Sequence, residues 1–130
     1  MSHKGHFPGS PADWLRYAYS DLELARVKRP PKVLFEGLCF HAQQAVEKAL
    51  KAVLIAKGVP PTKTHNIRTL LDLLPPDVVP PEEVEDAAGL TDYAVISRYP
   101  GDFESIDEKE YKETVQLAET VVFRAERIIQ

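Results

Sequence analysis

The sequence lacks several features that define common classes of protein. Among 130 residues there is one cysteine, Cys39, so no intramolecular disulfide can form and a disulfide-stabilised secreted domain is excluded. No run of about 18 apolar residues and no N-terminal apolar leader segment occurs, so we expect a cytoplasmic protein that does not enter a membrane. The six glycines are dispersed and form neither G-x-x-x-x-G-K nor G-x-G-x-x-G, which excludes the usual phosphate-binding loops.

The sequence also has little that suggests metal chemistry or covalent catalysis. Its four histidines, His3, His6, His41 and His65, are scattered and form no ligand motif with the single cysteine, so we expect neither a metal nor a cofactor. No carboxylate pair, serine triad or cysteine nucleophile can be recognised. Cys39 falls on the apolar arc of its predicted helix, which indicates a buried and unreactive thiol.

What is present is the composition of an ordinary globular domain, with 44% hydrophobic and 28% charged residues. The net charge of −4 hides an asymmetry: up to Pro81 there are 11 Lys and Arg against 7 Asp and Glu, and beyond it 5 against 13, giving +4 and −8. Three interpretations are open: solvated helix faces, complementarity within or between chains, and a basic phosphate-binding patch beside an acidic partner-binding face. A single asparagine and many loop prolines favour a thermophilic source.

Prolines divide the chain into segments of helix length. Four adjacent pairs, together with Pro11 and Pro100, mark the divisions, because proline cannot continue a helix interior. The segments between them run approximately over 12–29, 32–59, 62–74, 82–99 and 102–130. None of them alternates with period two, as a half-buried strand would. We therefore predict an all-α fold, an up-and-down helical bundle of four long helices and one short helix, forming one domain over 11–130 after a flexible segment 1–10.

Local signals refine the ends of these helices. Ser10 with Pro11 is typical of a helix start, and Gly58 is typical of a helix end. Segment 32–59 has the most regular apolar spacing, and its alanine-rich seam predicts a central helix that another backbone approaches closely. Segment 82–99 begins with an acidic first turn, and the last helix begins with Ser105 or Asp107 as its cap.

An arginine and a tyrosine near the end of segment 82–99 are the first candidate site. At 100° per residue Arg98 lies within about 20° of Thr91, in the middle of the stripe that should face the core. One interpretation is that Arg98 caps carbonyls in the last turn before Pro100 and extends to solvent. The other is that it points into a cleft as a bidentate phosphate ligand, with Tyr99 either stacking on a base or filling the end of the bundle.

A polar ridge on segment 32–59 is the second candidate site. His41, Gln44 and Lys48, with Lys51 beyond them, lie along one flank of the apolar arc at i, i+3 and i+7 spacing. They form either a boundary face with ordinary helix pairs, such as Glu47 with Lys51, or a groove wall that binds a nucleotide or an RNA backbone. A basic cluster, namely Arg26, Lys28, Arg29 and Lys32, is either a solvated loop or a phosphate contact.

Three blocks of sequence carry a resemblance to a known family. They are "FHAQQAVEKALKAVLIAKG" over Phe40–Gly58, "THNIRTLL" from Thr64, and "TDYAVISRYPGD" from Thr91 to Asp102. Together they resemble the HEPN domain (higher eukaryotes and prokaryotes nucleotide-binding) over roughly residues 12–130. The resemblance implies an up-and-down helical bundle that is usually a homodimer. It also implies pairing with a small nucleotidyltransferase encoded beside it, in toxin–antitoxin or related defence systems.

The same resemblance weakens the case for catalysis. Many members of the family are metal-independent ribonucleases that carry Arg, four to six residues, then His. Arg98 matches the first position, but Phe103, Glu104 and Ser105 stand where the histidine would be. The leading hypothesis is therefore a dimeric binding and interaction module that binds nucleotide or RNA phosphate near Arg98. A ribonuclease that takes its histidine from elsewhere, from His41 or His65, and a purely structural dimeric scaffold are the alternatives.

Overall fold

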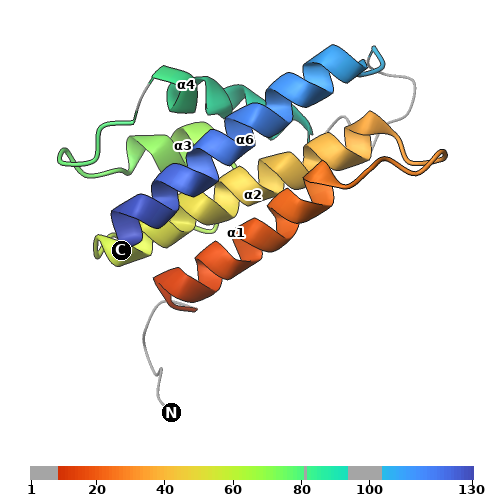
Figure 1. Cartoon of the computed structure of the whole chain (residues 1–130). Coiled ribbons are helices and arrows are strands. Elements are labelled where there is room, and N and C mark those ends of the chain that lie inside the picture. The colour runs from red at the N-terminus through yellow and green to blue at the C-terminus, as the bar shows by residue number, and fades with distance from the viewer. Residues whose placement is uncertain (1–8, 81, 94–103) are drawn as a thin grey trace.

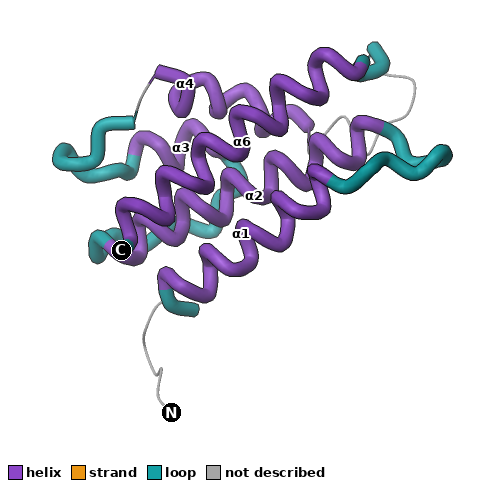
Figure 2. The backbone as a smooth tube through the Cα atoms, viewed as in Figure 1, coloured by secondary structure: helices purple, strands orange, loops and turns teal. Residues whose placement is uncertain are grey.

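A computed structural model of the chain describes residues 9–80, 82–93 and 104–130. All regular structure in these residues is helical, as Figure 2 shows, so the prediction of an all-α bundle is confirmed. The elements are α1 (Pro11–Arg26), α2 (Phe35–Ala56), α3 (Ile67–Asp72), α4 (Glu82–Glu85), a 3-10 helix η1 (Asp86–Asp92) and α6 (Glu108–Ile129).

The three long helices all contact one another, and the short elements pack on one side of them. In Figure 1, α1, α2 and α6 lie side by side, with α1 running antiparallel to the other two. The short elements α3, α4 and η1 pack against α2 and α6, away from α1. None of the described helices is long and apolar enough to cross a membrane.

Side-chain caps fix where the long helices begin. The hydroxyl of Ser10 accepts a hydrogen bond from the backbone N–H of Asp13, and the Asp13 carboxylate accepts one from the N–H of Ser10. This reciprocal pair confirms the predicted start of α1. For α6 the sequence left two possible caps, and the structure selects Asp107, whose carboxylate accepts a hydrogen bond from the N–H of Glu110 at 2.8 Å.

Glycine ends α2 as predicted. Gly58 has φ +75°, in the left-handed region that side chains avoid. Its N–H bonds to the carbonyl of Ile55 at 3.0 Å, and the N–H of Val59 bonds to the carbonyl of Leu54 at 2.9 Å. These two bonds satisfy carbonyls at the end of α2 and turn the chain back along the helix.

Two predicted helices differ in detail from those observed. The segment 62–74 is helical only over α3, because the Asn66 side chain caps it by accepting a hydrogen bond from the N–H of Thr69. The segment 82–99 begins at Glu82 as predicted, but from Asp86 it winds as a 3-10 helix. Glu82 and Asp86 are like charges four residues apart, which disfavours an α-helix, and Gly89 lowers helix propensity by about 1 kcal/mol. Residues 94–99 lie outside the described residues.

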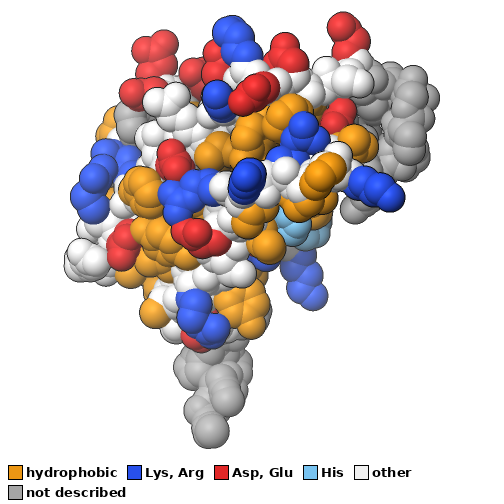
Figure 3. Space-filling view, turned by 45° about the vertical axis from the view of Figure 1, so that its right-hand side comes forward, with side chains coloured by type: hydrophobic (Ala, Val, Ile, Leu, Met, Phe, Trp, Pro, Cys, Tyr) orange, Lys and Arg blue, Asp and Glu red, His pale blue; other side chains and the backbone are white. Residues whose placement is uncertain are grey.

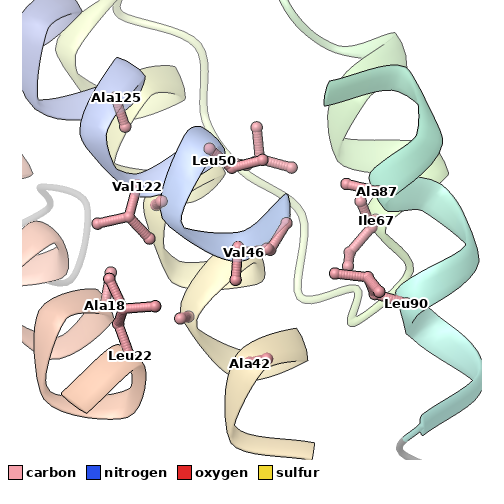
Figure 4. Packing of buried hydrophobic residues seen from close by; sticks show 14 of the residues in the cluster. Ala18, Leu22, Ala42, Val46, Leu50, Ile67, Ala87, Leu90, Val122 and Ala125 are labelled. Atoms are coloured by element: carbon pink, nitrogen blue, oxygen red, sulfur yellow. The ribbon is translucent and has the colours of Figure 1, made fainter. Parts of the chain in front are cut away.

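The core confirms the prediction of a central, alanine-rich α2. The small residues Ala42, Ala45, Ala49 and Ala52 are fully buried, which lets neighbouring helices approach its backbone closely. Figure 4 shows Ala18 and Leu22 of α1 near Val122 of α6, and Ile67 of α3 beside Ala87 and Leu90 of η1. The core therefore continues from the three long helices into the layer of short elements.

Polar contacts fasten α6 to α1. The Tyr111 hydroxyl donates to the carbonyl of Ala25 at 2.6 Å, and Arg26 Nη1 donates to Glu119 Oε2 at 2.8 Å. Arg29, of the same basic cluster, donates to the carbonyl of Val33 at 2.7 Å. Two members of the predicted basic cluster thus support the fold, Arg26 between α1 and α6 and Arg29 within its own loop.

Candidate functional site

The structure places the predicted polar ridge on an outer strip of α2, beside α1. His41, Gln44 and Lys48 are partly exposed there, whereas Lys51 is buried. His41 and Lys48 contact a buried carboxylate on α1, whereas Lys51 contacts a buried carboxylate on α2 itself. Arg98 and Tyr99 lie outside the described residues.

The first carboxylate is Asp21 of α1, whose side chain is only 10% exposed. Lys48 Nζ donates to its Oδ2 at 2.6 Å, and His41 Nδ1 lies 3.0 Å from its Oδ1. Because a carboxylate can only accept, we infer that Nδ1 of His41 carries the proton. The other ring nitrogen, Nε2, is then the one that His41 can offer to a ligand. We call Asp21, His41 and Lys48 the Asp21 cluster.

The second carboxylate is Glu47 of α2, whose side chain is 3% exposed. Its Oε2 accepts from Lys51 Nζ at 3.0 Å and lies 2.8 Å from Nδ1 of His65, in the loop before α3. Its Oε1 accepts from Gln43 Nε2 at 3.2 Å. Glu47 and Lys51 thus form the helix pair named in one of the two interpretations of the ridge, and the ammonium of Lys51 is already engaged. We call Glu47, Lys51, His65 and Gln43 the Glu47 cluster.

One atom of the Glu47 cluster is left without a partner. Gln43 is fully buried, and among the described residues its Oε1 accepts no hydrogen bond. An unpaired buried amide oxygen costs about 1–3 kcal/mol, so this position calls for a donor.

Two hollows flank Tyr17, an exposed aromatic residue of α1. One, of about 290 Å³, is lined by Gly9, Asp13, Trp14, Arg16 and Tyr17. The other, of about 270 Å³, is lined by Arg16, Tyr17, Ser20, Asp21 and Lys48. Cationic groups approach the aromatic rings: Lys48 Nζ lies 5.9 Å from the Tyr17 ring centroid, and Lys51 Nζ lies 5.5 Å from that of Trp14. We call these α1 residues, together with the α2 ridge, the α1–α2 face.

Sequence reasoning missed the α1 half of this face. Asp21 follows Ala18 by three residues and precedes Ala25 by four, so it lies on the buried stripe of its helix. A carboxylate on such a stripe was the available signal, because a buried charge needs a partner. Tyr17 carried no such signal, since a single exposed aromatic residue is common.

The charge asymmetry of the sequence appears in the structure as an acidic patch and as ion pairs between the two halves of the chain. Figure 3 shows acidic side chains gathered along the upper edge of the molecule, over α4 and the start of α6. Glu83, Asp86 and Glu113 line a hollow between these elements. Arg26–Glu119 and Arg68–Glu85, both at 2.8 Å, connect the basic half of the chain to the acidic half. These pairs favour complementarity within the chain as one source of the asymmetry.

Cys39 is buried, as predicted. Its side chain is fully covered, and burial raises the pKa of the thiol to about 12. The thiol therefore stays protonated at neutral pH and is a poor nucleophile. In the described parts of the chain, no three His, Cys, Asp or Glu side chains converge closely enough to hold a metal ion.

Comparisons with known proteins agree with this architecture. The sequence model of the HEPN domain matches residues 11–129. Among solved structures, TT1696 from Thermus thermophilus is similar at 31% identity and a TM-score of 0.75, over 91% of this chain and 97% of that one. ST0689, described as an archaeal HEPN homologue, is similar at 26% identity and a TM-score of 0.73, over 95% of this chain and 100% of that one. No curated protein matches.

Proposed function

The chain belongs to the HEPN domain family, and on that premise we propose that it is a dimeric binding module that recognises the phosphate of a nucleotide or RNA. The observation that carries the proposal is the Asp21 cluster. One carboxylate is shared there by an ammonium and an imidazole, both partly exposed. Asp21 orients the two groups and leaves further N–H donors on Lys48 for a phosphate oxygen, while the unprotonated Nε2 of His41 can accept a hydrogen bond from a ligand hydroxyl.

Arg98 is proposed as the second phosphate contact. Its support is the position of an arginine on the core-facing stripe of its sequence segment, together with the planar, permanently charged guanidinium that suits a phosphate.

Binding of a labelled nucleotide and of a short RNA at low salt tests both contacts. We expect Arg98→Ala and Lys48→Ala each to weaken binding, because each removes a donor from the phosphate. Lys109→Ala is the matched control, since it removes an exposed cation from α6, far along the chain from the α1–α2 face. Wild-type affinity in both Arg98→Ala and Lys48→Ala would contradict the proposal.

We further propose that the module forms a homodimer and associates with a small nucleotidyltransferase encoded beside it. Family membership supports this proposal, as do exposed apolar side chains such as Leu34 and Val79, which are 65% and 70% exposed. Co-expression with the neighbouring nucleotidyltransferase, followed by light scattering, should give a stable complex. A monomer that elutes apart from that protein would contradict this part.

A metal-independent ribonuclease is the second candidate, favoured by the contact between Asp21 and His41. A carboxylate that holds Nδ1 of an imidazole presents Nε2 as a general base, a contribution of about 10²–10⁴ in rate. RNA incubated with the protein and a chelator should then be cleaved, and cleavage should vanish in Arg98→Ala and His41→Ala. His65→Ala serves as the control. If the wild-type protein does not cleave RNA, the ribonuclease function is rejected and only the binding function is retained.

A further inference from the structure

We propose that the α1–α2 face binds unpaired nucleic acid, with a base stacked on the ring of Tyr17 and the adjoining phosphate held by Lys48 and Arg16. The inference rests on the proposed function, because it names the ligand class of the same face. Its new element is the aromatic residue of α1, which neither the ridge on α2 nor the arginine motif includes.

Tyr17 is placed as a stacking platform. Its side chain is 53% exposed, and it lines both hollows of the face, one on either side along α1. The Arg16 guanidinium carbon lies 5.1 Å from the ring centroid, and Lys48 Nζ lies 5.9 Å from it. Both cations lie over the exposed ring, and single-strand binding proteins likewise combine aromatic rings on which bases stack with neighbouring cations that follow the backbone.

The two hollows differ in character, and this difference orients the ligand. The hollow that includes Trp14 is mainly apolar and suits a base, whereas the hollow that includes Ser20, Asp21 and Lys48 is mainly polar and suits a sugar and phosphate. Each holds several times the ~30 Å³ of a water molecule. The face therefore fits units of one nucleotide rather than the surface of a duplex.

The charge balance of the face also favours an unpaired ligand. Three cations, Arg16, Lys48 and Lys51, are each ion-paired with a carboxylate, namely Asp13, Asp21 and Glu47. With neutral imidazoles their charges sum to zero, so counterion release contributes little affinity for a duplex backbone. Stacking on Tyr17 can supply the binding free energy that counterion release does not. It requires a base whose faces are not already covered by neighbouring base pairs. The Arg16–Asp13 pair is highly exposed, at 3.4 Å, so its guanidinium is easily redirected to a phosphate.

Binding measured by fluorescence anisotropy tests the proposal with three probes: a short single-stranded RNA, the same strand annealed to its complement, and inorganic tripolyphosphate as competitor. We expect Tyr17→Ala to weaken binding of the single strand about tenfold, because one stacked base is lost. Tyr17→Phe should retain wild-type affinity, since it keeps the ring. The affinity of Tyr17→Ala for duplex and tripolyphosphate should be unchanged. Leu24→Ala is the matched control, because it truncates another exposed apolar side chain of α1.

The emission of Trp14, the only tryptophan in the chain, gives a second measurement. Trp14 lines the apolar hollow, so a base bound there should change its fluorescence, whereas tripolyphosphate should not. Unchanged emission with saturating single-stranded RNA would overturn the placement of the base.

The outcomes separate this inference from the function on which it rests. If Lys48→Ala weakens binding of the single strand and Tyr17→Ala does not, the stacking platform is wrong and the phosphate function stands. If neither these two variants nor Arg98→Ala changes any affinity, the proposed function itself fails. If Tyr17→Ala leaves RNA affinity intact but dissociates the protein in sedimentation experiments, Tyr17 belongs to a protein interface and the proposal is overturned.

Discussion

The Asp21 cluster and the Glu47 cluster contain the same three kinds of group, a carboxylate, a lysine and a histidine, in two different settings. In the first, the carboxylate comes from α1 and both of its partners come from α2, with side-chain exposures of 23% for Lys48 and 36% for His41. In the second, the carboxylate and lysine lie one turn apart on α2, and Lys51 is 8% exposed. The histidine of the second cluster comes from a loop.

This difference separates a binding role from a structural one. In the Asp21 cluster the carboxylate is buried but its partners reach the surface, so a ligand can contact them without disturbing the fold. In the Glu47 cluster the ion pair itself is buried. The ammonium of Lys51 contacts the Glu47 carboxylate and the ring of Trp14 in place of water. Four experiments test this contrast.

The largest effect is expected from Glu47→Gln. The substitution leaves the buried ammonium of Lys51 without a countercharge, which costs about 3–5 kcal/mol. Chemical denaturation should show this as a fall in the free energy of unfolding. Glu113→Gln, at an exposed position of α6, is the control and should change it by about 0.5 kcal/mol or less. A loss below about 1 kcal/mol in Glu47→Gln would mean that Lys51 reaches water.

A double-mutant cycle between Glu47 and Lys51 sharpens the same point. Lys51→Met removes the stranded charge while keeping a side chain of similar length. The double variant Glu47→Gln with Lys51→Met should therefore be more stable than Glu47→Gln alone, with a coupling energy of about 0.5–3 kcal/mol. Additive losses in urea denaturation would show that the two residues are not a unit.

A smaller loss of stability is expected from Asp21→Asn, because Lys48 and His41 can turn to solvent. We expect about 1–3 kcal/mol, from the weaker hydrogen bonds that remain. The substitution also frees one cation, so the dependence of log affinity for single-stranded RNA on log salt should become steeper by about 0.7. An unchanged salt dependence would indicate that Lys48 does not contact the ligand. Glu47→Gln should leave this slope as in the wild type.

The smallest effect is expected from His65→Ala. The imidazole is 76% exposed, so its bond to Glu47 contributes about 0–1 kcal/mol to the free energy of unfolding. Its role is to hold the loop before α3 against α2, and limited proteolysis should therefore cut that loop faster in the variant. Equal rates of cleavage would show that Asn66 and Gly58 fix the loop without it.

Much of the fold was predictable because it depends on local chemistry. The caps at Ser10 and Asp107 and the end at Gly58 involve residues within a few positions of one another. The structure confirms Ser10 and Gly58 and selects Asp107 over Ser105. Apolar spacing placed α2 at the centre for the same reason. The change to a 3-10 helix at Asp86 was not predicted, because the acidic residues and Gly89 only lower helix propensity and do not by themselves specify a 3-10 helix.

Only the α2 residues of the candidate site were predictable from the sequence. Periodicity gathered His41, Gln44 and Lys48 on one strip, which needs only the geometry of a single helix. Which carboxylate each of them meets depends on how helices pack, and this could not be deduced from spacing. Asp21 is 20 residues from His41 along the chain and touches it because α1 and α2 are antiparallel neighbours. Tyr17 entered the site in the same way.

The contacts within the two clusters join residues that lie close together along the chain, and this predicts an order of folding. They join residues 18 to 27 positions apart outside the helix itself, whereas the bonds that fasten α6 to α1 join residues 86 to 107 positions apart. Closing a longer loop costs more chain entropy, and local contacts generally form first. We therefore expect α1 and α2 to assemble before α6 docks. In pulsed hydrogen exchange during refolding, amides of α6 should gain protection after those of α2.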